Sequence, residues 1–423
     1  MNAITNHEWC TWLGRRIVGG MNAHRRAIIA GGGIAGPALA IFLARAGIEP
    51  VVLEAHPLSD DVGGGFQIAP NGLRVLAALG IADDVIQAGH PSRDFCFKNH
   101  RGETIGVART AMSGPAANVA RAPLHRILRA AAAREGVTIR YEKRLAGIDE
   151  DGDRVVVTLE DGTTETGDFL IGADGVHSRV RAWMLPEHAR PRDTQMVSLG
   201  AFCSAAFAPD VAPEDHGRLT FIVGPKHQFG YSKMSATQWG WWCHVAVAND
   251  DERAELLTMP SDRLRDRMLE RYSGWCAPVA ALIDGSETWL RTSIHDVPRL
   301  PVWHRGRVAL IGDAAHAMSP AGGQGASLAL EDAMLLGMLV AERTRSIEET
   351  FARFERIRRS RAEAIVAQGY SNDRRTLKEL GAFEMWMRDA LLMRLAAPLI
   401  ARALNRVYAG EPALAASRGV AAE

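Results

Sequence analysis

The sequence predicts an α/β fold with a largely β-stranded insert and a helical C-terminal segment. Three observations lead to this prediction. A strand, a glycine-rich turn, a helix and a second strand follow one another between residues 26 and 54, which is the order of a βαβ unit. Strand patterns dominate residues 195–298, and helical patterns dominate from residue 348 onwards.

Length and composition place the chain among soluble multidomain proteins. With 423 residues it is long enough for two or three domains. Its 49 basic and 49 acidic residues cancel, so no net charge attracts nucleic acid. No stretch of 18 apolar residues occurs, so we expect no membrane span. The five cysteines are scattered without a C-x-x-C pair, which predicts no metal site and favours a reducing, cytoplasmic location.

The first residues differ from the rest of the chain. Met1 to Gly20 lack the apolar stretch of a signal peptide, and a second methionine, Met21, precedes the first strand. We therefore expect residues 1–24 to be a flexible leader, or to be present because the start codon lies upstream of Met21.

The βαβ pattern is clear in the first fifty residues of the folded part. Residues 27–30 form a short apolar run, and residues 34–46 read as a helix rich in alanine and leucine that ends at Gly47. Residues 48–53 form the second strand. The turn between the first strand and the helix therefore lies where a nucleotide would meet a helix N-terminus.

That turn has the sequence Gly-Gly-Gly-Ile-Ala-Gly and fits G-x-G-x-x-G. The first glycine permits a tight turn, the second lets a pyrophosphate approach the backbone, and the third lets the helix pack on the strand. An acid at the end of the second strand can accept hydrogen bonds from a ribose. A glycine turn between packed elements is the alternative, and the motif does not separate FAD from NAD. The expected cofactor contacts are Gly31, Gly33, Ile34, Ala35, Gly36 and Glu54.

Further elements follow from periodicity and turn signals. We expect helices at residues 70–79, 124–135, 262–271 and 327–342, hairpins at residues 95–107 and 155–172, and a buried strand at residues 308–311. The β-rich stretch between two parts of one α/β unit indicates a nucleotide-binding domain that is discontiguous in sequence.

Two more motifs suggest a family. Residues 169–179 run from a strand into Asp-Gly, and residues 306–316 run from a strand into Gly-Asp-Ala-Ala-His, followed by Pro320 and Gly-Gly-Gln-Gly. With the first glycine turn, in this order, they resemble the class A flavoprotein monooxygenases, such as para-hydroxybenzoate and salicylate hydroxylases and tetracycline-inactivating monooxygenases. The resemblance covers roughly residues 25–370. It implies a Rossmann-like FAD-binding domain of the para-hydroxybenzoate hydroxylase type.

The resemblance also implies a division of the chain. The FAD-binding domain would comprise residues 25–94, 116–194 and 299–365. A β-sheet substrate domain would comprise residues 95–115 and 195–298, and a helical segment would comprise residues 366–423. The apolar stretch 385–404 could lie on a membrane surface or, as we prefer, pack on the FAD domain or on a twin subunit.

Cofactor roles follow from the same resemblance. Asp313 would bind the ribityl or pyrophosphate part of FAD, and Arg121 its phosphates or ribityl chain. Asp174 and Gly175 would contact FAD and affect NAD(P)H binding, or form a turn with an Asp cap, and Leu145 would offer backbone to the adenine. A helix N-terminus would face the flavin N1–C2=O edge, where reduced flavin carries negative charge. The residues expected to contact the cofactor there are Gly312, Gly323, Gln324, Gly325 and Ala326.

Two positions depart from the family pattern, and one loop is unusual. Ala55 and His56 follow Glu54 where a basic residue is common, and Ser327 stands where many members have Asn. The loop Gly63–Gly65 could tolerate a moving flavin ring, or could be an irregular connection that needs positive φ.

The catalytic and substrate residues are the hardest to predict. Pro320 would shape the cavity on one face of the flavin, and His316 is a candidate base or a structural histidine. Along residues 240–247 the side chains alternate between two faces, one of which must face the pocket. The candidate substrate contacts are Phe221, His227, Tyr231 and His244.

The implied activity is an FAD-dependent monooxygenase. It would use NADPH or NADH and O2, through a flavin C4a-hydroperoxide, to hydroxylate an aromatic or polyketide-like small molecule, as a monomer or homodimer. FAD would supply the chemistry, and the protein a dry, oriented site. A dehydrogenase, reductase or epoxidase of the same fold is the alternative. A non-enzymatic FAD-binding protein that sequesters its ligand is another.

Overall fold

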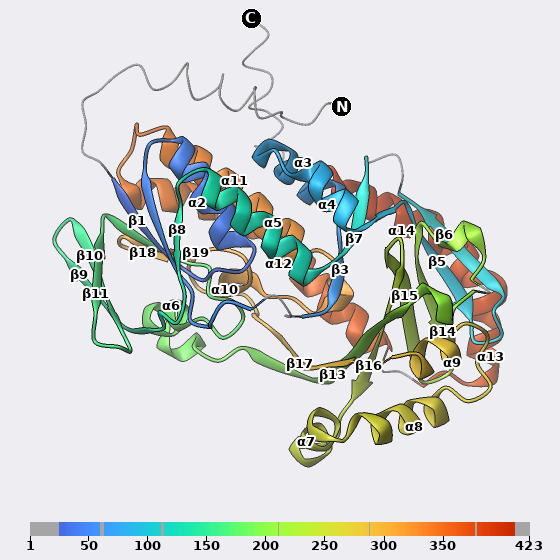
Figure 1. Cartoon of the computed structure of the whole chain (residues 1–423). Helices are drawn as coiled ribbons and strands as arrows, with labels where there is room; N and C mark the ends of the chain where they lie inside the picture. The colour runs from blue at the N-terminus through green and yellow to red at the C-terminus, as the bar shows by residue number, and fades with distance from the viewer. Residues whose placement is uncertain are drawn as a thin grey trace, which may run out of the picture.

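The computed structural model describes residues 25–59, 63–110, 114–209, 211–286, 288–376 and 379–410. Two large sheets lie towards opposite ends of the molecule, and long helices run across both (Figure 1). The predicted leader at residues 1–24 and the last part of the helical segment, residues 411–423, lie outside the described residues.

The first large sheet contains the predicted βαβ unit. Its four central neighbours are parallel and nearly all buried, which explains why they read as continuous apolar runs rather than alternating ones. In spatial order the strands are β18 (His304–Arg305), β19 (Val308–Leu310), β12 (Phe169–Gly172), β1 (Arg26–Ala30), β2 (Glu49–Leu53) and β8 (Thr138–Arg140). Helices α2 (Ala35–Arg45), α5 (Arg121–Arg134) and α11 (Gly325–Ala341) belong to this lobe (Figure 1).

Besides α10 (Asp313–His316), two small sheets and three further short helices belong to this lobe. The sheets are β11 (Thr164–Gly167), β10 (Arg154–Leu159) and β9 (Leu145–Asp151), and β3 (Gly65–Ile68), β7 (Ala116–Ala120) and β4 (His90–Ser92). The helices are α3 (Pro70–Leu79), α4 (Ala82–Ala88) and α6 (Arg179–Met184). The hairpin predicted at residues 155–172 is divided between two sheets: residues 155–158 pair with β11 in a three-stranded sheet, whereas residues 169–172 form β12 of the six-stranded sheet. Strand β9 was missed because its second half, Glu-Asp, is acidic and exposed, which disfavours a strand assignment.

The second large sheet has seven strands and includes the hairpin predicted at residues 95–107. The spatial order is β17 (Thr288–Asp296), β13 (Arg192–Ser204), β16 (Gln238–Ala246), β15 (Gln228–Ser235), β14 (Arg218–Val223), β5 (Asp94–Asn99) and β6 (Thr104–Arg109). Strand β14 pairs in parallel with β5. The hairpin β5–β6 thereby extends the sheet that residues 192–296 build.

One face of this sheet packs on helices and forms a second core. Trp239, Trp241, Phe229 and Cys243 lie there, against α7 (Asp250–Thr258), α8 (Ser261–Arg271) and α9 (Val279–Asp284). The sequence predicted only α8. Helix α7 has almost no apolar face and α9 is a short apolar stretch, so periodicity could not separate either of them from a loop or a strand. The opposite face of the sheet is left for a cavity.

The C-terminal helices cross from one lobe to the other. Helix α12 (Ile347–Thr376) is followed by α13 (Ala382–Met387) and α14 (Met393–Tyr408). A Cβ at Gly106 would lie 3.0 Å from the carbonyl oxygen of Met393, so this glycine lets α14 pack directly on β6. The outer side of α13, α14 and the segment between them exposes Phe383, Trp386, Leu391, Leu392 and Leu395. Among the described residues, no helix is both long and apolar enough to cross a membrane.

A buried charge cluster ties α11 to α12. The Arg358 guanidinium donates to Glu331 Oε2 at 2.9 Å and to Asp332 Oδ1 at 2.7 Å. Asp332 Oδ2 also accepts from the Gly312 backbone N–H at 2.9 Å and pairs with His316 Nε2 at 2.6 Å. The side chains of Arg358, Glu331 and Asp332 are each at most 1 % exposed. Helix packing and the turn at Gly312 therefore depend on compensated buried charge.

The lowered pKa of the Asp332 carboxylate predicts that the fold is less stable in acid. Burial raises its pKa, but His316 and Arg358 more than offset burial and lower the pKa to about 2. A carboxyl group whose pKa is lower in the folded state stabilises the fold above its ordinary pKa near 4, and this contribution disappears as the pH falls towards 2. We therefore expect Asp332→Asn to lower the melting temperature at pH 6, and the gap to wild type to narrow by pH 3. A gap that stays constant between these pH values would contradict the assignment.

Candidate active site

A large cavity lies between the two lobes. Its volume is about 1600 Å³, and its walls come from the glycine turn, from the seven-stranded sheet and from α14. Pockets for one small ligand occupy roughly 300–1000 Å³. The cavity is therefore large enough for a dinucleotide together with a second small molecule.

The glycine turn after β1 has the geometry of a pyrophosphate site. Gly31 has φ of +110°, and a Cβ there would lie 2.2 Å from the Ala173 carbonyl oxygen. A Cβ at Gly36 would lie 2.0 Å from the Gly31 carbonyl oxygen, whereas one at Gly33 would meet nothing within 4 Å. Gly31 and Gly36 are thus required for packing, and Gly33 opens the backbone to the cavity. Ile34 and Ala35 line the cavity beside it, at the start of α2.

Glu54 faces the cavity at the end of β2. Its carboxylate accepts from the Gly32 N–H at 2.7 Å and from the His56 N–H at 2.8 Å, and pairs with His56 Nδ1 at 2.8 Å. Burial raises the pKa of Glu54, but these hydrogen bonds lower it by more. The carboxylate is therefore ionised where a ribose diol would lie, and His56 provides a partner at the position where a basic residue was expected nearby.

Arg121 begins α5 and extends along the cavity wall. Its guanidinium carbon lies 6.0 Å from the centre of the Phe66 ring. A Cβ at Gly63 would lie 2.6 Å from Arg121 Cδ, and Gly63 has φ of +94°. The positive-φ interpretation of the glycine loop therefore holds at Gly63, and Gly65 belongs to strand β3. The loop leaves Arg121 exposed to the cavity, where its guanidinium would be available to phosphates.

Asp174, Gly175 and Leu145 line the same end of the cavity. The Asp174 carboxylate accepts from Ser178 Oγ at 2.5 Å and from the Arg179 N–H at 2.8 Å, and burial raises its pKa. This side chain thus caps the start of α6, which is the alternative that the sequence left open. The Leu145 carbonyl already accepts from the Arg179 guanidinium.

The third motif forms the middle of the cavity. Asp313 is exposed to it although Gly312 and Ala314 on either side are buried. Helix α11 starts at Gly325, two residues earlier than expected, with Gln324 at its N-cap. Its first N–H groups have no partner within the helix, so they favour an anion. The cavity-lining residues here are Pro320, Gly323, Gln324, Gly325 and Ala326.

Three residues of the glycine turn and of the third motif lie behind the cavity wall. Gly36 and Gly312 do not line it, and Gly312 has φ of +57° and donates to Asp332. Ser327 is fully buried, and its Oγ accepts from the Ala69 N–H at 3.1 Å. Its hydroxyl therefore fixes the start of α3 instead of reaching a cofactor.

Two predicted residues must be corrected. His316 is 2 % exposed and belongs to the cluster around Asp332, so it is a structural histidine and does not face the cavity. Tyr231 is 1 % exposed and packs on Trp239 in the second core. Its neighbour Ser232 lines the cavity, and alternation along β15 therefore turns Tyr231 to the opposite face.

The remaining substrate candidates lie on the cavity side of the seven-stranded sheet. Phe221, His227 and His244 all line the cavity. Phe221 stacks on Phe97 with ring centres 5.8 Å apart, and Trp242 meets it edge-on at 5.8 Å. Sequence reasoning missed the contribution of Phe97, although Phe95 and Phe97 alternate along β5 as side chains on one face do. The cavity-facing side of α14 was also missed.

The residues present fit FAD. One cavity is lined by the open glycine turn, the ionised Glu54, the Arg121 guanidinium and the start of α11. These groups suit a pyrophosphate, a ribose and a flavin. Agreement comes from a family model described as an FAD binding domain, which matches residues 25–369. The chain belongs to the group A FAD-dependent aromatic monooxygenases. FAD is its cofactor and NAD(P)H its co-substrate.

Relatives of this monooxygenase act on different compounds. It is 31 % identical to aurachin C monooxygenase/isomerase of Stigmatella aurantiaca, over 86 % of this chain and 93 % of that protein. It is 32 % identical to FAD-dependent urate hydroxylase of Klebsiella pneumoniae, over 86 % and 94 % of the two chains. The structure of Klebsiella pneumoniae HpxO with FAD and uric acid superimposes with a TM-score of 0.78 at 28 % identity, covering 92 % of this chain and 97 % of that one.

Arg121 in this monooxygenase should contribute strongly to FAD affinity. Hydrogen bonds to charged groups contribute about 1.5–3 kcal/mol, so Arg121→Ala should weaken FAD binding by about 10- to 150-fold. Titration of the apoprotein with FAD, followed by flavin fluorescence, measures this change. Arg126→Ala is the matched control, because Arg126 is exposed on the same helix and does not line the cavity. Equal affinities for the two variants would remove Arg121 from the cofactor site.

Proposed function

We propose that this monooxygenase hydroxylates the ring of a small aromatic molecule that lies between the Pro320 loop and the aromatic face of the seven-stranded sheet. The supporting observation is that Pro320, the start of α11 and the Phe221–Trp242 pair line one cavity. A ring stacked on these side chains is held next to the place where the flavin would meet the helix N-terminus.

The residues of the chain bind, orient and exclude water. Asp313 and the N–H groups at Gly325 and Ala326 would hold the flavin, with negative charge stabilised at the helix start. Bound FAD supplies the activation of O2. The aromatic face of the sheet orients the substrate ring, and Pro320 restricts the space in front of it. A dry cavity favours oxygen transfer to substrate over release of H2O2.

We further propose the division into an FAD-binding domain and a substrate domain given above. The two separate buried cores support it: one surrounds α2 and α11, and the other surrounds β16 and α8. We also propose a cytoplasmic location, supported by the free thiols of Cys96, Cys203, Cys243 and Cys276. A monomer or a homodimer is compatible with these features, and light scattering distinguishes them.

The test follows NADPH and NADH consumption in air with H2O2 counted, with and without a panel of phenols and fused aromatics. One compound that accelerates consumption while H2O2 falls short of the reductant used would establish coupled oxygenation. H2O2 equal to the reductant for every compound, with rapid reduction of an artificial acceptor, would favour a dehydrogenase. Tight ligand binding without any consumption would favour a sequestering protein.

A further inference from the structure

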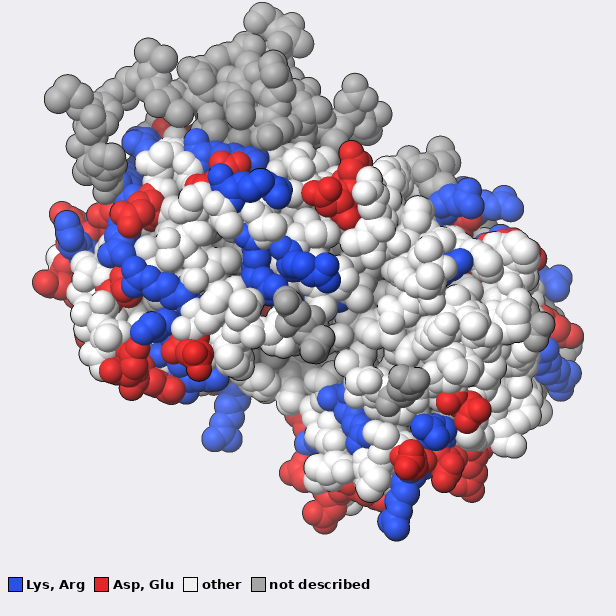
Figure 2. Space-filling model, viewed as in Figure 1, with Lys and Arg blue, Asp and Glu red and all other residues white. Residues whose placement is uncertain are grey.

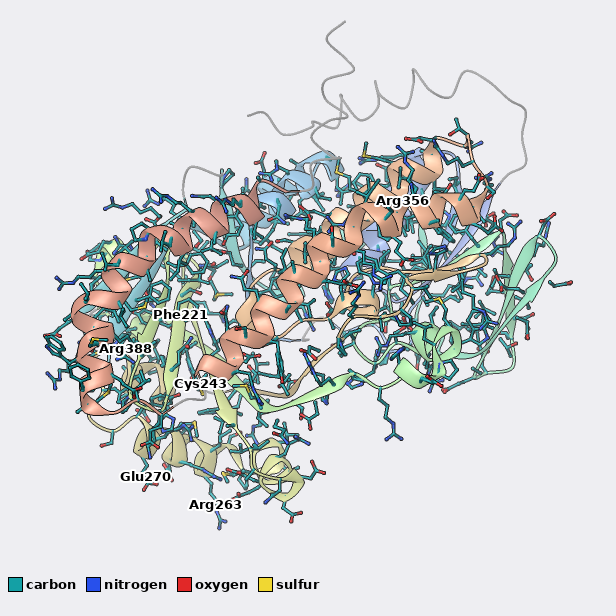
Figure 3. All side chains as sticks on the ribbon, turned by 180° about the vertical axis from the view of Figure 1, so that it is seen from behind. Phe221, Cys243, Arg263, Glu270, Arg356 and Arg388 are labelled. Carbon is teal, nitrogen blue, oxygen red and sulfur yellow. The ribbon has the colours of Figure 1, made fainter. Side chains whose placement is uncertain are left out.

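The cations at the substrate end of the cavity are already paired. We define this end by the strands β5, β13, β14, β15, β16 and β17 with α14. Arg388 lies beside the sheet that carries Phe221 (Figure 3). Its guanidinium donates to Asp389 at 2.7 Å, to the Gly224 carbonyl at 2.9 Å and to the Val223 carbonyl at 3.3 Å. Lys226 pairs with Glu379 at 2.8 Å. The Arg388 charge is thus already compensated, and the Lys226 pair lies at the surface with both side chains more than half exposed, so neither residue places an unpaired, buried cation in the pocket.

The two histidines at this end are neutral. Burial, then the nearby Arg271, lowers the pKa of His227 to about 4, and its Nδ1 lies 2.9 Å from the Arg271 guanidinium. Burial alone lowers the pKa of His244 to about 4. His244 Nε2 is buried and has no hydrogen-bond partner among the described residues. It is therefore an uncharged imidazole nitrogen that can bind a substrate hydroxyl or carbonyl.

The floor of this end is a continuous aromatic row. Phe97 pairs in register with Phe221, Phe221 with Gly230, and Gly230 with Trp242. A Cβ at Gly230 would lie 2.3 Å from the Trp242 ring, so the glycine is what allows the indole to lie flat across β15. A parallel row is polar but uncharged, because Ser198 pairs in register with His244 and with Thr292.

The opposite wall is aliphatic. Met393, Ile400, Ala403, Leu404 and Val407 of α14 line the cavity, and so does the more exposed Leu399. On the outer surface of this lobe, the area facing the viewer at the right is largely uncharged, whereas charged side chains gather at its right edge and over α7–α8 below (Figure 2). A planar ring on the aromatic floor would therefore direct any substituent opposite the polar row towards hydrocarbon.

We propose that the pocket takes a flat, uncharged aromatic compound with a hydrocarbon substituent and discriminates against aromatic carboxylates. This inference rests on the proposed function. A carboxylate buried here would lose its hydration without gaining a cation. A hydroxyl or carbonyl would keep a hydrogen bond through His244, Ser198 or Thr292, and an alkyl chain would gain the contacts of α14.

Three naphthols that differ at one position test the proposal on the FAD-loaded enzyme. They are 2-naphthol, 6-butyl-2-naphthol and 6-hydroxy-2-naphthoate, and binding is followed by perturbation of the flavin absorption spectrum and by quenching of tryptophan fluorescence. Relative to 2-naphthol, we expect the butyl compound to bind at least about 10-fold tighter and the carboxylate at least about 100-fold weaker. A carboxylate that binds as tightly as 2-naphthol would overturn the proposal, and so would the failure of all three to bind at millimolar concentration.

Substitutions at His244 test whether the lack of a cation causes the discrimination against carboxylates. His244→Arg supplies the missing cation, so the carboxylate should gain at least about 10-fold in affinity while 2-naphthol loses affinity. His244→Gln is the matched control, because it keeps a neutral polar group and should retain the discrimination. Far-UV circular dichroism and the flavin spectrum establish that both variants fold. Should His244→Arg not fold, the wild-type series decides alone.

The readouts separate this proposal from the proposed function. Neutral naphthols that bind with the expected preference but leave H2O2 equal to the reductant consumed would refute the hydroxylase and support the pocket chemistry. A carboxylate that binds tightly and is hydroxylated would refute the pocket chemistry and support the hydroxylase.

Discussion

A Gly33→Asp variant is expected to fold and to lose FAD. Because a Cβ at Gly33 would meet nothing within 4 Å, the apoprotein has room for the side chain. The carboxylate would stand where the pyrophosphate must approach the backbone, and repulsion between the two anions adds to the steric conflict. We expect FAD affinity to fall by more than about 1000-fold, since several charge-assisted contacts are lost together.

The measurement is an FAD titration of the apoprotein with the visible spectrum of the purified variant. Gly36→Ala is the informative comparison, because its Cβ would lie 2.0 Å from the Gly31 carbonyl oxygen. That variant should fail to fold stably, whereas Gly33→Asp should melt close to the wild-type apoprotein. A yellow Gly33→Asp protein with bound FAD would mean that the pyrophosphate does not approach this turn.

An Arg358→Ala variant is expected to be strongly destabilised without a change in any cavity-lining residue. The substitution leaves Glu331 and Asp332 buried without their guanidinium. Breaking a buried ion pair by removing one partner costs about 3–5 kcal/mol. Thermal unfolding of the FAD-loaded protein, together with urea unfolding, measures the loss.

Arg356→Ala provides the control on the same helix. Arg356 lies on the outer surface of α12, two residues before Arg358 (Figure 3). Substitutions at such surface positions usually change stability by no more than about 0.5 kcal/mol. Similar melting temperatures for the two variants would show that the buried cluster contributes little to the fold.

The sequence was informative wherever structure depends on neighbours along the chain. The turn Gly31–Gly36, the helix 70–79 and the hairpin 95–107 were predicted because glycine positions, apolar periodicity and turn residues are local signals. The same is true of the cavity-lining residues Gly33, Glu54 and Asp313, which follow strand ends that the motif order identifies; their contacts with FAD stay a prediction. These parts of the fold and of the site could be predicted with their residues.

The errors occurred where a contact between residues far apart in the sequence determines the position or role of a side chain. Alternation along β15 and β16 gives two faces but does not say which one meets the cavity, and so Tyr231 was placed on the wrong side. His316 is part of a motif, but its role depends on Asp332 and Arg358, which lie in two later helices. Helix α14 lines the cavity because Gly106 lets it approach β6, and no pattern within α14 itself indicates this partner.

The buried cluster around Arg358 also affects when the fold can form during synthesis on the ribosome. Strand β1 emerges first, but its sheet gains β19 only after residue 310, and Glu331 and Asp332 acquire their guanidinium only with Arg358. Until then the nascent chain carries an open sheet, and Glu331 and Asp332 lack this guanidinium, with His316 as the partner already available to Asp332. We therefore expect the N-terminal nucleotide motif to mature, and the cofactor to be captured, only after α12 has emerged.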